Sequence, residues 1–319
     1  MKKIIKILIA VLLLSFTAKA FAASKKSIVC TTFPQYDWIK NIIGEKSSSF
    51  ELTLLLNNGT DLHSYQPSIK DIAKISVCDL FVYVGGESDE WVENVLANAK
   101  NKSMVVVNLM EVLEDRVYEE ELVEGMQGEE EEGEDEEEEG PEYDEHIWLS
   151  LTNAAAVTQV LLEKICSLDL KNAGTYKNNT QAYVSKLNAL NKKYAQTVAA
   201  AKYDTLLYAD RFPFRYLVED YGLKYYAAFI GCSAESEASF ATIKFLADKL
   251  KELKLPAVLI LEKSDGKIAS TVIEASGQRG VEILEMDSIQ SVTQKEIKAG
   301  KNYLNTMEKN LETLKAALN

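Results

Sequence analysis

Only two histidines occur among the 319 residues, and both lie in polar segments flanked by turn-forming residues. His63 lies in TDLHSYQP, residues 60–67, and His146 lies in YDEHIWL, residues 143–149. Neutral imidazole is the commonest nitrogen ligand of zinc-like cations, and two rings from distant segments meet only if the fold brings them together. The pair is therefore a candidate metal site. The alternative is two hydrogen-bonded loop histidines that hold no metal.

An acidic segment precedes the second histidine. Residues 119–145 contain 17 acidic residues and no basic one, so the net charge of -14 becomes +3 for the rest of the chain. The run from Glu129 to Gly140 has too little apolar surface to offset its ordering entropy, which predicts a disordered, self-repelling loop. Its carboxylates would attract divalent cations and pass them to a site near His146. The alternative is an insertion that only adds solubility. No nucleic-acid footprint is expected.

The amino-terminal residues have the layout of a secretory signal. Lysines at the start are followed by an apolar run from Ile7 to Phe16 and an A-x-A-like site, so cleavage is expected after Ala22. The alternative, a membrane anchor, requires about 20 apolar residues, which is more than this run supplies. An exported, periplasmic protein is predicted. Its four scattered cysteines form no CxxC pair, and free thiols are favoured over a disulfide.

Short apolar strands alternate with amphipathic helices, which predicts α/β lobes with mainly parallel sheets. Strands are expected at 27–32, 51–56, 80–84, 104–109, 205–209, 224–229, 257–261 and 281–286. Helices are expected at 35–44, 68–77, 89–99, 152–166, 173–201, 212–221, 239–253, 267–275 and 293–318.

The helix expected at 173–201 carries apolar residues at intervals of three and four with no proline, a stripe able to pack on both lobes. The predicted domains are a signal peptide at 1–22, a first lobe at 23–171 with the acidic loop at 119–145, a linking helix at 172–202 and a second lobe at 203–319. One rigid connecting helix would make large hinge closure difficult.

These segments resemble a known family, the zinc/manganese substrate-binding proteins of ABC importers, of the TroA-like or ZnuA-like type. IVCTTFPQYDW at 28–38 is similar to the family's first strand and helix, and GTDLHSYQPSIKDI at 59–72 to its first ligand motif. DEHIWLS at 144–150 is similar to the second ligand motif, although Leu151 stands where proline is usual. The resemblance covers nearly the whole chain after residue 22.

The resemblance implies two α/β lobes joined by a single long helix, with one cation bound between them. His63 and His146 are the implied ligands of the first lobe and Asp287 that of the second, although Asp287 could instead cap the next turn. The remaining family ligand falls at Arg211, whose guanidinium has no acceptor and cannot ligate a cation. Three outcomes are open: water fills the vacant ligand position, a neighbouring side chain substitutes as ligand, or the site binds metal less tightly. Arg211 could pair with a carboxylate such as Asp287. The substitutes considered are Asp210, Cys232, Glu235 and Glu237.

Zinc is the expected cargo and manganese the second choice, because imidazole and carboxylate ligands suit both. The resemblance implies delivery to an ABC-type permease in the membrane by a monomer without enzymatic activity. A zinc hydrolase is a rival, but the chain lacks HExxH, GxSxG, P-loop and GxGxxG motifs. A metal-binding adhesin of the same fold is the other alternative.

Overall fold

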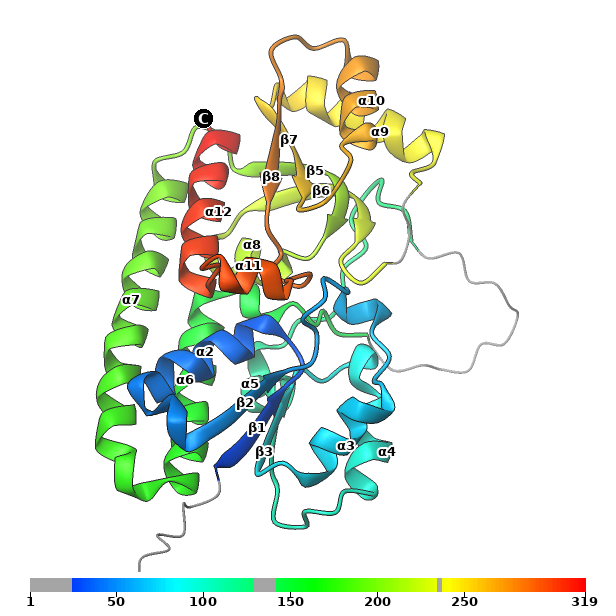
Figure 1. Ribbon diagram of the computed structural model, residues 1–319. Helices are drawn as coiled ribbons and strands as arrows, with labels where there is room; N and C mark the ends of the chain where they lie inside the picture. Colours follow the sequence, from blue (N-terminus) through cyan, green and yellow to red (C-terminus); the bar gives the residue numbers. More distant parts are fainter. Residues whose placement is uncertain (1–24, 129–141, 234–236) are drawn as a thin grey trace, which may run out of the picture.

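The structure is a computed structural model that describes residues 25–128, 142–233 and 237–319. The predicted signal peptide and the whole acidic run from Glu129 to Gly140 lie outside these ranges, as does Glu235. Figure 1 shows two lobes, one above the other, with long helices along one side.

Each lobe is built on a four-stranded parallel sheet. The first has the order β2-β1-β3-β4 and the second the order β6-β5-β7-β8, and all neighbouring strands are parallel. The predicted parallel α/β architecture is therefore confirmed. The strands are β1 (Lys26–Cys30), β2 (Phe50–Leu54), β3 (Leu80–Tyr83), β4 (Val105–Asn108), β5 (Thr205–Phe212), β6 (Lys224–Ile230), β7 (Ala257–Leu261) and β8 (Glu282–Met286).

Helices of the first lobe begin at local capping signals. Thr32 and Gln35 form a capping box before α2, and Ser68 and Asp71 form another before α3. Such boxes satisfy backbone N–H groups that the first turn leaves without partners. The helices are α2 (Phe33–Ile43), α3 (Ile69–Val77), α4 (Trp91–Ala97), α5 (Leu109–Leu113) and α6 (Leu151–Leu168).

A single long helix, α7 (Ala173–Ala199), connects the lobes, as expected. Its predicted apolar stripe is buried at Tyr183, Leu187, Leu190 and Tyr194. It packs against α2 and α6 of the first lobe and against α12 of the second, and Figure 1 shows it running along both. The exact domain boundaries stay a prediction.

The second lobe differs from the predictions at two points. The helix expected over 293–318 is wrong, because Gly300 at φ +99° ends α11 and Asn302 caps a separate α12. Strand β5 continues three residues past its predicted end, with a register shift between Tyr208 and Arg211. Arg211 therefore belongs to a strand. The helices are α8 (Arg215–Tyr221), α9 (Phe240–Leu253), α10 (Lys267–Ser276), α11 (Gln294–Lys298) and α12 (Tyr303–Ala317).

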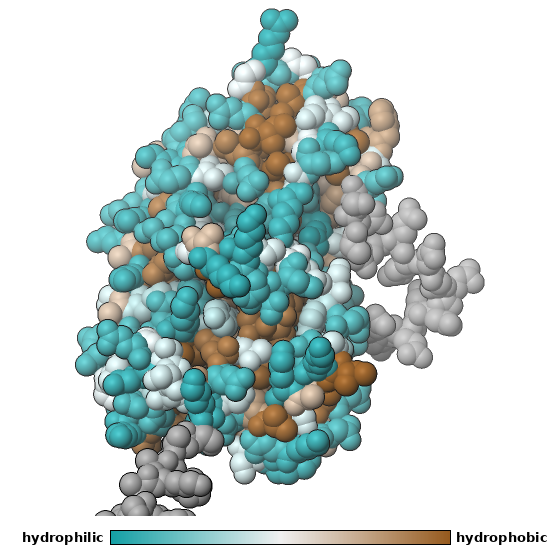
Figure 2. Space-filling model, viewed as in Figure 1, coloured by the Kyte–Doolittle hydropathy of each residue, from teal (hydrophilic) through white to brown (hydrophobic). Residues whose placement is uncertain are grey.

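Buried hydrogen bonds fasten the lobes to one another besides α7. Trp148 Nε1 donates to the Ser288 carbonyl oxygen at 2.8 Å, and Tyr303 Oη donates to the Trp148 carbonyl oxygen at 2.6 Å. Tyr216 Oη donates to the Asp144 carbonyl oxygen at 2.6 Å. These bonds fix the segment around His146 against the second lobe. The space-filling view shows mainly hydrophilic residues on the outer face near this junction (Figure 2).

Among the helices of the described ranges, none is both long enough and apolar enough to cross a membrane.

Candidate metal centre

Both histidines are positioned by an aspartate two residues earlier in the chain. His63 lies in a 3₁₀ turn, Leu62–Ser64, where its backbone N–H donates to Asp61 Oδ1 at 3.1 Å. The backbone N–H of His146 donates to Asp144 Oδ1 at 2.8 Å. Aspartate favours this bond to a backbone N–H two residues on. The shared Asp-x-His pattern is thus a sequence signal for these supporting residues.

The two rings face each other through their Nε2 atoms. The distance from His63 Nε2 to His146 Nε2 is 3.1 Å, and Gln290 Oε1 lies 3.0 Å from His146 Nε2. The ring of His146 is completely buried, and the side chain of His63 is 10% exposed. Two nitrogens and an amide oxygen from three distant parts of the chain therefore converge on one small volume.

The opposite ring nitrogens hold the rings in orientation. His146 Nδ1 lies 3.0 Å from Asp144 Oδ1, which can only accept, so Nδ1 carries a proton. Although burial alone would lower it, the charge of Asp144 and this hydrogen bond raise the pKa of His146, so Nε2 offers its lone pair to a metal once it has given up its own proton. His63 Nδ1 contacts Ser88 Oγ at 2.9 Å and lies 3.5 Å from Glu145 Oε2. A metal-binding histidine characteristically donates its other N–H to an oxygen in this way.

Burial and mutual repulsion keep the two rings from being positively charged at the same time. Burial, the neighbouring His146 and Arg211 lower the pKa of His63 to about 3, against a smaller opposite effect from Asp61. His63 is therefore neutral near pH 7 and offers a lone pair. Burial raises the pKa of Glu145 to about 7, although bonds from Ser88 oppose the rise.

Cys232 completes a group of three side chains suited to a metal. The ligand atoms of His63, His146 and Cys232 all lie within 4.8 Å of one another. Cys232 follows the carboxyl end of β6, and a side chain on the preceding Gly231 would lie 3.2 Å from His146 Cε1. The glycine therefore lets this second-lobe segment lie directly against the first-lobe ring. Burial, Asp144 and Glu120 raise the pKa of Cys232 well above its ordinary value.

Asp287, the predicted third ligand, is not part of this group. Its carboxylate accepts from Lys301 Nζ and, through Oδ1, from the backbone N–H of Ile289 at 2.9 Å. It therefore acts as a turn-forming residue and an ion-pair partner, one of the alternatives open from the sequence.

Arg211 forms the carboxylate pair expected of it, but with Asp61 instead of Asp287. Arg211 Nη2 donates to Asp61 Oδ2 at 2.7 Å, and Nη1 donates to the Ser233 carbonyl oxygen at 3.2 Å. One guanidinium thus contacts both the segment that carries His63 and the segment that carries Cys232. Arg211 thus supports these two segments.

The other suggested substitutes lie apart from the histidine pair. Asp210 accepts from the backbone N–H groups of Arg211 and Leu261, and Glu237 is exposed. Glu235 lies outside the described residues. Gln290 is not predicted from the sequence, because the surrounding residues give no distinguishing signal. None of the four cysteines, all within the described ranges, forms a disulfide.

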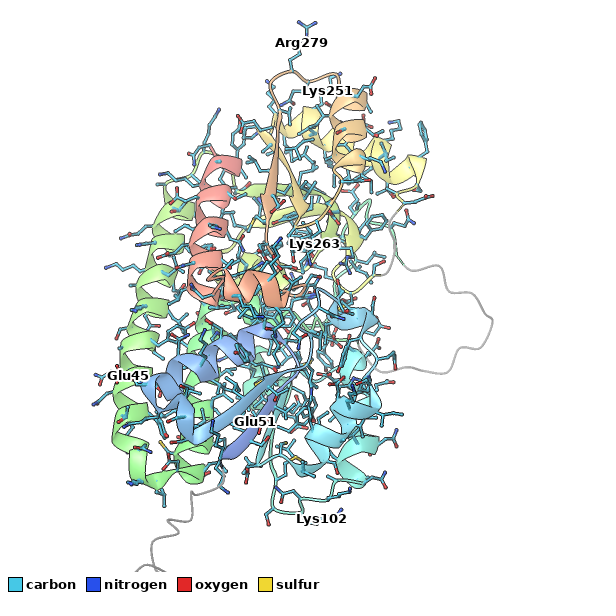
Figure 3. All side chains as sticks on the ribbon, viewed as in Figure 1. Glu45, Glu51, Lys102, Lys251, Lys263 and Arg279 are labelled. Carbon is cyan, nitrogen blue, oxygen red and sulfur yellow. The ribbon has the colours of Figure 1, made fainter. Side chains whose placement is uncertain are left out.

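A cavity of about 780 Å³ adjoins the Arg211–Asp61 pair and is lined mainly by polar residues of the second lobe. Lys263 forms part of its wall and donates to the Ser291 carbonyl oxygen. Figure 3 shows Lys263 at the junction between the lobes. The ion pair therefore borders solvent-filled space on one side and the ligand-bearing segments on the other.

Comparisons with known proteins place the chain in a family. The family described as ZnuA, zinc-uptake complex component A, periplasmic, matches residues 28–317. The zinc-binding lipoprotein AdcA of Streptococcus pneumoniae is 33% identical over 97% of this chain, which spans 59% of that protein's length. The high-affinity zinc uptake system protein ZnuA of Bacillus subtilis is 30% identical over 92% of this chain and 88% of its own length.

A solved structure supports the same assignment. The Zn(II)-bound ZnuA-like domain of Streptococcus pneumoniae AdcA superimposes with a TM-score of 0.71 at 28% identity, over 92% of this chain and 99% of that domain. Together with the match over residues 28–317, this shows that the chain belongs to the ZnuA family of periplasmic zinc-uptake components.

Proposed function

We propose that this protein captures a divalent transition metal, Zn²⁺ first and Mn²⁺ second, outside the cytoplasm and delivers it to an ABC-type permease. The proposal includes no catalysed reaction. It requires export by a cleavable signal peptide and function as a monomer in the periplasm. The zinc-related names of the AdcA and ZnuA relatives support it.

The observation that carries the proposal is the convergence of lone pairs. Asp144 holds the Nδ1 proton of His146, so once Nε2 has released its own proton the facing Nε2 atoms and Gln290 Oε1 are acceptors separated by 3.0 to 3.1 Å. Acceptors at such distances repel one another unless a proton or a cation lies between them. A zinc ion binds imidazole nitrogen at about 2.0–2.1 Å, so small movements of the rings would accommodate it.

The binding part of the proposal is tested by zinc titration calorimetry on the purified chain. One tight site is expected in the natural protein, and His63→Ala and His146→Ala should each abolish it, because each removes a nitrogen ligand. Gln66→Ala, at an exposed position of the loop that carries His63, is the matched control and should retain the site. Tight binding by the double histidine variant would overturn the proposal.

The transport part is tested in cells. Deleting the gene should slow zinc uptake at low external zinc, and the natural gene should restore it. A gene carrying both histidine substitutions should fail to restore uptake although its product is exported normally. Restoration by that variant would exclude the histidine pair as the cargo site.

A further inference from the structure

The second lobe offers the histidine pair a sulfur atom. Cys232 Sγ lies in the same 4.8 Å group as the ligand nitrogens of His63 and His146. Gly231 places the cysteine there, since any side chain at that position would crowd the His146 ring and the Phe212 carbonyl oxygen, the latter at 2.9 Å. Cysteine sulfur, as thiolate, is a strong zinc ligand.

Neighbouring second-lobe residues have their polar groups engaged elsewhere. The Asp287 carboxylate binds Lys301, and the Arg211 guanidinium binds Asp61 and Ser233. Asp210 accepts from two backbone N–H groups. Gln290 contributes only a neutral amide oxygen, which is a weaker ligand than a charged carboxylate.

We propose that Cys232 is the second-lobe metal ligand and that its sulfur makes the site select thiophilic cations such as Zn²⁺ over Mn²⁺. This inference rests on the proposed function and names the residue that decides its cargo. Soft thiolate favours zinc and copper, whereas manganese prefers carboxylate, carbonyl and water oxygens. The thiol proton passes to solvent as the sulfur–metal bond forms, and no oxidation or reduction takes place.

The inference is consistent with the position of Arg211. The same side chain donates to the carbonyl oxygen of Ser233, next to Cys232 in the chain. Arg211 is therefore a positioning residue for the cysteine segment, and Cys232 supplies the bond to the metal.

The first test uses Co²⁺ as a spectroscopic probe of the natural protein. Cobalt bound through sulfur gives an intense thiolate-to-metal charge-transfer absorption in the near ultraviolet, in addition to its weaker visible bands. The natural protein and Cys166→Ser, the control at a half-buried cysteine in α6, should both show this absorption. Its absence from the natural protein loaded with one Co²⁺ would overturn the inference without depending on any variant's folding.

The second test compares zinc and manganese affinities. Cys232→Ser should weaken Zn²⁺ binding by more than about 100-fold, beyond the usual effect of removing an outer-sphere partner. Cys232→Asp should bind Mn²⁺ more tightly relative to Zn²⁺ than the natural protein does. Circular dichroism and thermal unfolding of each variant verify the fold.

The outcomes separate this inference from the proposed function. Unchanged zinc affinity in Cys232→Ser, with binding still abolished by His63→Ala, would overturn the cysteine ligand and leave the receptor function intact. Zinc binding that survives loss of both histidines would overturn the proposed function itself.

Discussion

The contact between Arg211 and Asp61 predicts a measurable coupling between the lobes. Arg211 lies in β5 of the second lobe, and Asp61 precedes His63 in the first. Their atoms Nη2 and Oδ2 are 2.7 Å apart, with side chains 21% and 17% exposed. Although burial alone would raise the pKa of Asp61, the charge of Arg211 and the hydrogen bonds from Arg211 and the His63 backbone lower it below its ordinary value. The carboxylate is therefore ionised and paired near pH 7.

The expected magnitude follows from the distance and the partial burial. Two unit charges at 2.7 Å attract by about 6 kcal/mol at an effective dielectric constant of 20. Desolvation of both groups offsets most of this, so the net coupling should lie between an exposed and a buried pair, at about 1–3 kcal/mol. Each kcal/mol lost should lower the melting temperature by about 2–4 °C.

A double-mutant cycle measures this coupling. Arg211→Ala and Asp61→Asn are made singly and together, and the free energy of unfolding is obtained from urea titrations of the metal-free protein. Asparagine at 61 keeps an oxygen for the His63 backbone N–H and replaces the oxygen that accepts from Arg211 with a neutral NH₂ group. The double variant should be more stable than the sum of the single effects predicts, by the coupling energy.

A matched control establishes the baseline. Arg279 points into solvent at the tip of the second lobe (Figure 3), and Arg279→Ala should change stability by less than about 0.5 kcal/mol. A coupling within about 0.5 kcal/mol of zero for Arg211 and Asp61, the usual additivity error, would refute the claim that this pair fastens the lobes.

Three further predictions follow from burial, packing and ligand linkage. Burial raises the pKa of Asp37 to about 6, so between its unfolded value of 3.8 and this value the folded state binds more protons than the unfolded state. The free energy of unfolding should therefore fall by up to about 3 kcal/mol as the pH rises from 4 to 7. Urea titrations of Asp37→Asn should show a weaker dependence of this free energy on pH. Gly231→Ala should destabilise the fold by about 1–3 kcal/mol and weaken zinc binding, because the added methyl group would meet Phe212 and His146. Calorimetry with and without zinc measures both effects, and an unchanged melting temperature would contradict the close packing at Gly231. Zinc at 100 times its dissociation constant should stabilise the protein by about 2.7 kcal/mol, observed as a higher melting temperature that a chelator reverses, and an increase that persists in His63→Ala would place the bound zinc elsewhere.

The sequence predicts most of the fold because its signals are local. The alternation of strands and helices appears in the chain, and β7 has the bounds expected from its apolar run. The long helix α7 shows its stripe in the spacing of Tyr183, Leu187, Leu190 and Tyr194. The single helix predicted over 293–318 is interrupted at Gly300. The residues on both sides favour helix, and the positive φ of this glycine becomes evident only in the structure.

The metal centre is predictable on the first-lobe side for the same reason. Each histidine follows an aspartate that fixes it through a contact spanning two residues, and this contact is visible as Asp-x-His in the sequence. Chemistry alone also excludes Arg211 as a ligand. These conclusions require no knowledge of how the lobes are oriented.

The second-lobe side depends on that orientation. Parallel strands bring Arg211, Cys232 and Asp287 to the carboxyl edge of one sheet, so the sequence can name candidates but cannot rank them. The choice is made by contacts between residues far apart in the chain. Trp148 donates to the Ser288 carbonyl oxygen and Tyr216 donates to that of Asp144.

In this arrangement the segments beyond β6 and β8 both reach the His146 ring, the latter through Gln290 Oε1 at 3.0 Å from Nε2. Gly231 lies against that ring, while the Asp287 carboxylate, just beyond β8, is engaged by Lys301. Which side chains of one sheet edge lie beside the histidine pair is thus set by docking that no local pattern encodes. A change at Trp148 or Tyr216 that loosens this docking should therefore disturb metal binding even though neither residue belongs to the group of three ligand side chains.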